Sequence, residues 1–374
     1  MPENMFERKI SVAFNPETSY NASGKHIRDG LSCALRTGNN FWFCCDERSS
    51  LERLTILEDG SLGKHKQFDL SAYLELPSAT DCEIDIEGLG LDENYLWLTG
   101  SHSLARKKPR KKDSIEKQIK RLATVKEDPN RYILAKIPIV KDPETGDYEL
   151  FKTTNSPRQA NPFQASQLAF KGRRNRLMEV LEDDEHFKHF MKIPGKDNGF
   201  DIEGLAVDND KIYIGVRGPV LRGWAVILEL QFEEAAKGFF DLKPFQKGKY
   251  YKKHFLRLQG MGIRDLIILE KDMLILAGPT MDIDGTISVY RWKNALLAQS
   301  DTVVHRSEMQ KLFDVPHGYG EKSGRDKAEG MALYDPNSLL IVFDSPTDER
   351  KAGESQVAAD LFRIPGEHHI PEND

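Results

Sequence analysis

The sequence predicts an all-β fold, a single closed β-propeller, on three observations. A short unit of two apolar strands joined by a polar turn recurs five times along the 374 residues. Aromatic residues make up 9% of the chain, which also contains 28 Gly and 18 Pro, a composition typical of a turn-rich fold. Charged residues are 30% and hydrophobic residues 39%, which excludes a disordered or fibrous chain.

The five copies share two short apolar strands on either side of an Asn, Asp, Gly or Pro turn. They begin at Asp29, Asp85, Asp201, Gly262 and Ala328. A hairpin alone buries too little apolar surface to be stable, so the copies must pack round a common axis. Units of ~40–65 residues with three or four strands are typical of propeller blades.

The spacing of the copies leaves the number of blades open. Positions 88 and 204 are 116 residues apart, twice the 58 that separate positions 30 and 88. No hairpin is evident in 155–199, where apolar residues recur at helical spacing at 177, 180, 181, 187 and 190. We therefore expect five blades, with six as the alternative, and a helical insertion over 155–199 between blades 2 and 3. Residues 9–14 are expected to supply a last strand that closes the ring.

One domain is expected to cover residues 1–374, with a basic loop insertion over 101–131. The first residues are polar, and no stretch approaches the ~18 apolar residues of a membrane helix. The four cysteines, Cys33, Cys44, Cys45 and Cys82, lack the spacing of a disulfide framework. We expect reduced thiols, a cytoplasmic location and no membrane partner.

Polar residues gather where the inner strands begin and where the second strands end, and in a propeller these loops meet on one face. The loops carry Arg28, Asp85, Glu87, His102, Asp201, Glu203, Arg217, Arg264 and Glu329. Convergent carboxylates are ligands for a hard divalent cation such as Ca²⁺ or Mg²⁺, and arginines suit an anionic group on that cation. The alternative is that each carboxylate only binds backbone amides of the neighbouring blade.

The run 106–112 is strongly basic and follows His102 closely, so it lies in a loop over the same mouth. It is either a solvated charge run or a clamp for a phosphate, a nucleic acid or an acidic protein. The net charge of −6 excludes a protein whose whole surface binds nucleic acid.

Several segments resemble a bacterial family known as domain of unknown function 3616. They are Asp-Ile-Glu-Gly-Leu at 85–89 and 201–205, Thr-Gly-Ser-His at 99–102, Lys-Asp-Asn-Gly-Phe at 196–200 and Arg-Gly-Pro-Val-Leu-Arg-Gly-Trp-Ala at 217–225. The resemblance covers roughly residues 11–365; it implies a β-propeller and brings no activity. More distantly, the Glu-Gly turns resemble those of esterase-like phytase and calcium-dependent lactonase propellers. That analogy implies Glu87, Glu203 and Glu329 as metal ligands.

Two functional hypotheses follow. In the first, the protein is a divalent-metal-dependent hydrolase or binder of a small phosphoester or ester at the axial mouth. In this hypothesis Glu87, Glu203 and Glu329 hold the metal, and Asp85 or Asp201 activates a water molecule. His102 is the general acid or base, and Arg28, Arg217 and Arg264 bind the substrate anion. In the second, the protein is a non-enzymatic propeller scaffold that binds a protein or nucleic-acid partner through this face and the basic loop 106–112.

Overall fold

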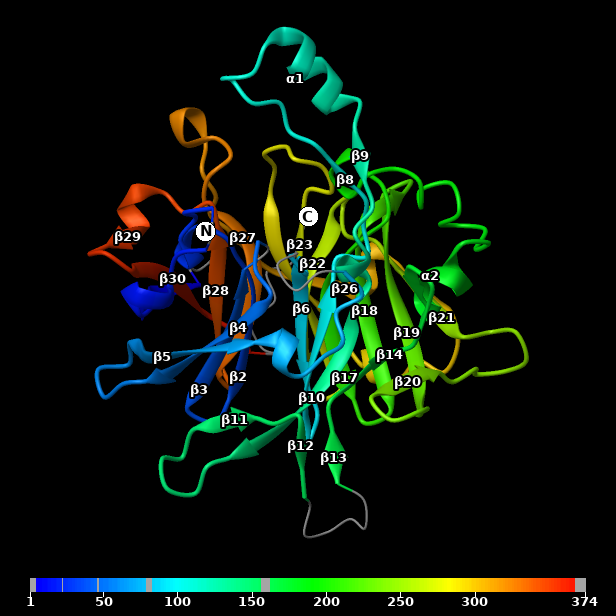
Figure 1. Cartoon of the computed structure of the whole chain (residues 1–374), viewed down its shortest axis with the longest axis horizontal. Coiled ribbons are helices and arrows are strands. Elements are labelled where there is room, and N and C mark those ends of the chain that lie inside the picture. The colour runs from blue at the N-terminus through cyan, green and yellow to red at the C-terminus, as the bar shows by residue number, and fades with distance from the viewer. Residues whose placement is uncertain (1–4, 22, 46, 79–82, 156–161, 367–374) are drawn as a thin grey trace.

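The chain folds into sheets of mainly antiparallel strands, which Figure 1 shows side by side across the body. The computed structural model describes residues 5–21, 23–45, 47–78, 83–155 and 162–366. Within these residues, five groups of four strands can be traced. Four of the groups consist of strands that follow one another along the chain, and the N-terminal strand completes the fifth. All-β architecture is therefore confirmed.

Each group runs from an inner strand to an outer one. The first is β2 (Leu31–Thr37), β3 (Asn40–Cys45), β4 (Ser50–Ile56) and β5 (Leu62–Asp69); the second is β6 (Ile86–Leu91), β7 (Tyr95–Gly100), β10 (Leu134–Lys141) and β14 (Ser166–Leu168). The third is β17 (Asp201–Asp208), β18 (Lys211–Leu221), β19 (Trp224–Glu234) and β21 (Tyr251–Leu256); the fourth is β22 (Gly262–Leu269), β23 (Asp272–Gly278), β24 (Ile287–Trp292) and β26 (Met309–Val315). The fifth is β27 (Lys327–Asp335), β28 (Ser338–Asp344), β30 (Gln356–Arg363) and β1 (Phe6–Ala13).

The inner strands form a closed ring. β2 contacts β6, β6 contacts β17, β17 contacts β22, β22 contacts β27, and β27 contacts β2. The N-terminal strand β1 pairs antiparallel with β30, from Phe6 opposite Phe362 to Ala13 opposite Gln356. The first strand of the chain thus completes the last sheet, as the sequence predicted, and the architecture is that of a β-propeller.

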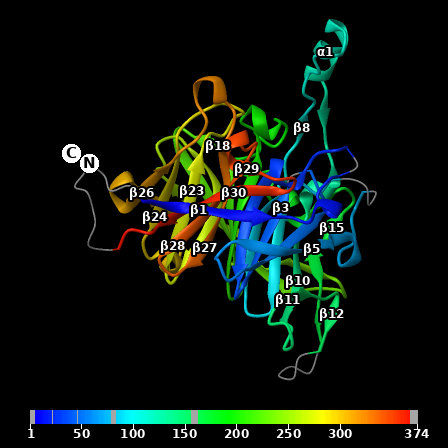
Figure 2. The ribbon, with the colours of Figure 1, turned by 90° about the vertical axis from the view of Figure 1, so that its left-hand side faces the viewer.

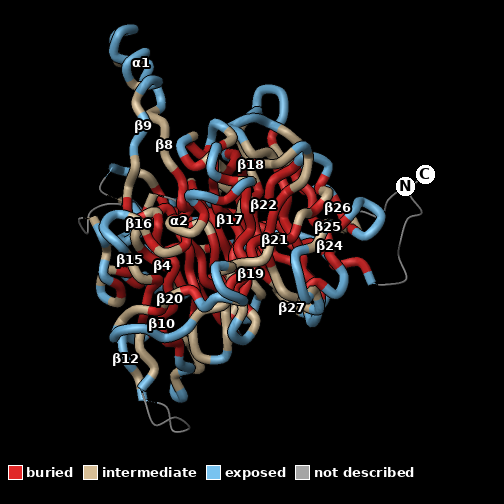
Figure 3. Tube along the Cα trace, turned by 90° about the vertical axis from the view of Figure 1, so that its right-hand side faces the viewer, coloured by how far each residue is buried: buried red, intermediate tan, exposed pale blue. Residues whose placement is uncertain are grey.

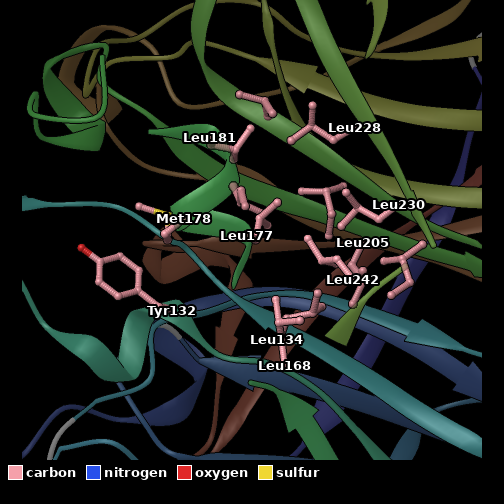
Figure 4. Close-up of a cluster of buried hydrophobic side chains, with 14 of the residues drawn as sticks. Tyr132, Leu134, Leu168, Leu177, Met178, Leu181, Leu205, Leu228, Leu230 and Leu242 are labelled. Atoms are coloured by element: carbon pink, nitrogen blue, oxygen red, sulfur yellow. The ribbon is translucent and has the colours of Figure 1, made fainter. Parts of the chain in front are cut away.

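The core lies between neighbouring sheets, and its largest cluster joins the second and third groups. Leu134 and Leu168 on one side meet Leu205 and Leu228 on the other (Figure 4). The short helix α2 (Arg176–Leu181) adds Leu177, Met178 and Leu181 to this cluster. Burying a leucine side chain stabilises the fold by about 1.5–3 kcal/mol, so this junction holds two sheets together.

The segment predicted as a helical insertion contains more than a helix. Residues 162–199 include β13 (Phe163–Gln164), β14, β15 (Phe170–Lys171), β16 (Arg174–Asn175) and α2. β14 pairs with β10 and belongs to the second group. Phe187, one of the residues assigned to the predicted helix, is buried but lies in a turn. Apolar residues needed at one buried surface can therefore show a helical period without a continuous helix.

A slender projection leaves the body between the second and third strands of the second group. It comprises β8 (Ala105–Arg106), α1 (Ile115–Leu122) and β9 (Val125–Lys126), and β8 pairs antiparallel with β9 (Figures 1 and 2). We call residues 105–126 the basic arm. Figure 3 shows that its outer part is exposed, in contrast to the buried strands of the body.

The remaining strands are short and peripheral. They are β11 (Tyr148–Leu150), β12 (Thr153–Thr154), β20 (Phe239–Leu242), β25 (Thr302–Val304) and β29 (Lys351–Ala352). In the described ranges, neither α1 nor α2 has the length and apolar character needed to cross a membrane. Cys33, Cys44 and Cys45 are buried thiols, and Cys82 lies outside the described residues.

Candidate functional site

Each inner strand carries a β-bulge close to its beginning, and these bulges build the site. The pairing register skips one residue in every inner hairpin; the skipped residues are Ser32, Glu87, Glu203, Arg264 and Glu329. A bulge adds a residue that leaves the regular alternation and is re-aimed. The five structurally equivalent positions therefore hold one serine, three glutamates and one arginine.

The bulge register corrects the alignment of the first repeat. Cys33, and not Gly30, corresponds to Gly88, Gly204 and Gly330. The glycines are needed because the inner strands approach closely: a Cβ on Gly330 would lie 2.6 Å from Cys33 Cα. The Glu-Gly pair thus combines a re-aimed side chain with a close contact between strands.

An ion-pair network joins the third, fourth and fifth groups. Arg217 lies on β18, the strand that pairs with the inner strand β17, and it forms ion pairs with Asp201 and with Glu203. Arg264 Nη1 donates to Glu329 Oε1 at 2.8 Å and lies 3.6 Å from Glu203 Oε2. All of these side chains except that of Glu329 belong to buried residues. Their charges are therefore compensated within the protein.

Asp85 has a separate partner. Its Oδ2 lies 2.8 Å from Nη1 of Arg131, which comes from the turn Pro129–Tyr132. Asp85 adopts a left-handed backbone conformation, with φ of 58°. This conformation is uncommon for a residue other than glycine and marks a position constrained by its surroundings.

Glu87 differs from the other carboxylates. No hydrogen bond or ion pair reaches its carboxyl group from the residues that the structure describes. Burial raises the pKa of Glu87 well above its usual value, and the charges of Asp85 and Glu203 raise it further. Burial also raises the pKa of Glu203, to about 7, but there Arg217 and Arg264 oppose the rise. Of these two glutamates, Glu87 thus retains a proton more readily.

A cavity of about 380 Å³ opens beside these groups. Its buried wall includes Asp85, Asp201 and Arg217, and the half-buried Glu87 also lines it. On its exposed side several charges are already paired, such as Lys25 with Glu47 and Arg106 with Asp197.

Three lysines on the cavity wall, Lys107, Lys108 and Lys196, have no ion pair with any described residue. Glu329, Asp85 and Glu87 raise the pKa of Lys196, an exposed residue, above its usual range. The carboxyl group of Glu87 and the ammonium groups of the three lysines are therefore the charged groups of the cavity for which no ion pair with a described residue is found.

Two residues expected at the mouth lie elsewhere. His102 is buried and does not line the cavity: its Nδ1 donates to Gly100 O at 2.8 Å, and its Nε2 accepts from Asn175 Nδ2 at 2.8 Å. Burial lowers the pKa of His102 to about 4, so the ring is neutral. Arg28 donates from Nη1 to Gly353 O and Gln356 O, at 3.2 and 3.1 Å, and so holds the turn before β30.

Asp265 binds backbone amides, which is the alternative to metal binding that the sequence left open for the carboxylates. Its carboxylate accepts from Leu266 N and from Met331 N, both at 2.8 Å. It therefore ties β22 to the next inner strand. This position, one residue after the bulge, is glycine in three of the other inner strands.

The glutamates expected to ligate a divalent cation do not fit one. Glu203 and Glu329 are ion-paired with arginines whose guanidinium groups stand among the carboxylates. Among the described residues, no group of three or more His, Cys, Asp or Glu side chains has the arrangement of a metal site. A cation at the axis would face the like charges of Arg217 and Arg264, so we derive no chemistry through a metal.

Sequence reasoning missed two charged residues of the site. Arg131 lies at the end of the basic insertion, and nothing in its local sequence indicates that it pairs with Asp85. Lys196 belongs to the segment 196–200 on which the family resemblance rests, and that segment was the available signal.

Solved structures with a similar overall course have little sequence in common with this chain. Glutaminyl cyclase of Myxococcus xanthus is 12% identical, with 96% of this chain and 99% of that one covered and a TM-score of 0.37. A streptogramin B lyase is 7% identical (96% and 100% covered, TM-score 0.35). The PQQ-bound aldose sugar dehydrogenase of Streptomyces coelicolor is 10% identical (95% and 98% covered, TM-score 0.38).

Such scores carry no argument about function. A comparison with curated proteins gave no match. A family model, however, matches residues 30–360, which is most of the chain. The chain belongs to the family described as "Protein of unknown function (DUF3616)".

Proposed function

We propose that the axial cavity binds a small phosphoester or related ester and that Glu87 supplies the acid–base chemistry for its hydrolysis. One observation carries the proposal: once internal ion pairs are counted, a half-buried, unpaired carboxyl group and three lysines remain in one cavity. An anionic group of the ligand would face Lys107, Lys108 and Lys196. Its ester oxygen would face Glu87.

The chemistry follows from the difference between two carboxyl groups. Glu87 keeps its proton to a higher pH than an ordinary glutamate because its pKa is raised by burial and by Asp85. A neutral carboxylic acid can protonate a leaving oxygen. Asp85, which forms an ion pair with Arg131, can accept a proton from the attacking water. The ester bond breaks, water oxygen bonds to the phosphorus or acyl carbon, and the two products leave.

We further propose that the propeller has five blades of four strands each. The support is that each inner strand begins a four-stranded group and that β1 completes the fifth. A sixth blade would need its own hairpin between β14 and β17. The strands there, β15 and β16, are two residues long each. The insertion is then the stretch from β15 to the start of β17, with α2 as its helix.

The proposal is tested by hydrolysis assays with p-nitrophenyl phosphate, bis-p-nitrophenyl phosphate and p-nitrophenyl acetate, with binding followed by thermal melting. We expect turnover or stabilisation with at least one of them, and loss of turnover in Glu87→Gln. Glu144→Gln, at an exposed glutamate away from the cavity, is the matched control and should behave as wild type. Lys107→Ala with Lys108→Ala should raise KM.

The contradicting results are equally definite. If no probe in the panel is bound or hydrolysed by the wild type, the ligand class is wrong. If Glu87→Gln turns over as fast as the wild type, Glu87 is not the acid–base group.

A further inference from the structure

The basic arm has a charge opposite to that of the body. Residues 105–126 contain ten Lys or Arg and two Asp or Glu, a net charge of +8. The whole chain has net charge −6, so the remainder carries −6 − 8 = −14. A basic segment of this density on an acidic protein is the electrostatic signature of a surface for an anionic partner.

The helix of the arm also presents apolar side chains to solvent. Ile115, Ile119 and Leu122 recur at the i, i+4 and i+7 positions, so they share one face of α1. Their exposed fractions are 75%, 62% and 48%. Figures 1 and 2 both show α1 standing clear of the body at the end of the β8–β9 stalk. Among the residues that the structure describes, no apolar surface of the body covers the apolar face of this amphipathic helix.

Internal contacts hold the arm in this shape. Ser114 caps α1 by accepting from Lys117 N, and Lys117 Nζ lies 3.0 Å from Asp113. Arg121 Nε donates to Lys108 O at 2.6 Å, which ties the helix back to the stalk. Arg106 pairs with Asp197 at the base. The apolar face is therefore presented by a built element.

We propose that the basic arm docks the protein on an anionic lipid surface. Ile115, Ile119 and Leu122 enter the headgroup region, and the surrounding lysines and arginines pair with lipid phosphates and carboxylates. With eight residues, α1 is far too short to span the bilayer and lies in its plane. The expectation of no membrane partner rested on the lack of a spanning segment, and an interfacial helix needs none.

Two features favour lipid over the other anionic partners. The arm contains no Phe, Tyr or Trp, the residues on which unpaired bases stack. Its aliphatic side chains also make no favourable contact with the phosphate backbone of a nucleic acid. The stalk also holds the body, which carries −14, away from the docking surface, and repulsion falls off within about 10 Å at ordinary salt. An extended anionic surface would repel the whole acidic body, so docking on it requires a stalk. A groove on a single protein would face only the arm and would not require one. The inference is independent of the proposed function.

The test is co-sedimentation of the full chain with two kinds of vesicle. One is phosphatidylcholine alone, and the other is phosphatidylcholine with phosphatidylserine at roughly two to one. We expect binding to the second kind only, weakened by salt. Arg110→Ala with Lys111→Ala and Lys112→Ala should lower the affinity at least about tenfold. Ile115→Ser with Ile119→Ser should lower it by a similar factor.

Lys237→Ala with Lys247→Ala, two exposed lysines on the body, is the charge-loss control and should bind as the wild type. All of these positions are exposed, so an unchanged melting temperature will verify folding. The proposal is overturned if the wild type does not sediment with anionic vesicles. It is equally overturned if the isoleucine variant binds as the wild type, or if duplex DNA or RNA is bound while vesicles are not.

Discussion

The pentapeptide Asp-Ile-Glu-Gly-Leu occurs twice at the axis, at 85–89 and at 201–205, and its two copies have different electrostatic surroundings. In the second copy, Asp201 and Glu203 share Arg217, and Arg264 lies 3.6 Å from Glu203 Oε2. In the first copy, Asp85 has Arg131, and no described cation pairs with Glu87.

The difference arises from neighbours and not from the pentapeptide. The pairing registers place Ser101 where the other hairpin has Arg217. The bulge of the next inner strand holds Glu203 beside the first copy and Arg264 beside the second. One copy is therefore neutralised by arginines, while the other keeps a carboxyl group that no described cation pairs with. Four predictions test this contrast.

The largest effect is expected for Arg217→Met. This change leaves Asp201 and Glu203 buried without their shared cation, which should cost about 3–5 kcal/mol of folding free energy. Urea denaturation measures it. Arg110→Met, at an exposed arginine, should change the stability by less than about 0.5 kcal/mol. A loss at Arg217 as small as that at Arg110 would mean that the second copy is not held by its arginine.

Next is Gly330→Ala, which tests the close packing of the inner strands β27 and β2 in the ring that carries both copies. The added Cβ would lie 2.6 Å from the backbone of Cys33, so we expect a loss of about 1–3 kcal/mol. Gly366→Ala is the control, since a Cβ there meets nothing within 4 Å. Equal stabilities for the two variants would show that the inner strands can move apart at no cost.

Glu87→Gln should gain more stability relative to the wild type than Glu203→Gln as the pH rises. The pKa of Glu87 is raised in the folded protein, so its favourable contribution is present below the pKa of the unfolded chain and is lost as the pH rises. The melting temperature of Glu87→Gln, relative to that of the wild type, should therefore increase as the pH rises from about 5 to about 8.

In Glu203→Gln the gain should be smaller, because Arg217 and Arg264 oppose the rise of the Glu203 pKa, which is about 7. If the two variants gain equally across this range, the two copies do not differ as described.

The smallest effect is expected from divalent cations. Because Arg217 and Arg264 stand among the carboxylates, Ca²⁺ or Mg²⁺ at millimolar concentration should leave the melting temperature unchanged. A stabilisation by either ion that disappears in Glu87→Gln would restore a metal site at the first copy and would remove the contrast between the two copies.

The sequence predicted the architecture because its signals are local and repeated. Alternating apolar strands and turn residues identify the hairpins, and regular spacing implies a ring. The same ring brings Asp85, Glu87, Asp201, Arg217 and Arg264 to one end, although their functional roles remain predictions.

What the sequence lacked was register and long-range pairing. A bulge is one extra residue in a strand, and without knowledge of the pairing the first repeat was aligned on Gly30 in place of Cys33. Whether Arg217 faces two carboxylates, or His102 turns to Asn175, depends on contacts between residues far apart in the chain. Such contacts leave no local pattern.

The protonation of Glu87 is the most direct test of the contrast between the two copies. Infrared difference spectra at about pH 8, between the wild type and each glutamine variant, would report the carbonyl band of a protonated carboxyl group. Burial also raises the pKa of Asp265 well above its usual value, so this group contributes to the band as well. We predict that the wild-type band is weakened in Glu87→Gln and is unchanged in Glu203→Gln. A wild-type spectrum whose band is unchanged in Glu87→Gln would contradict the account, because the first copy would then be ionised like an ordinary surface glutamate.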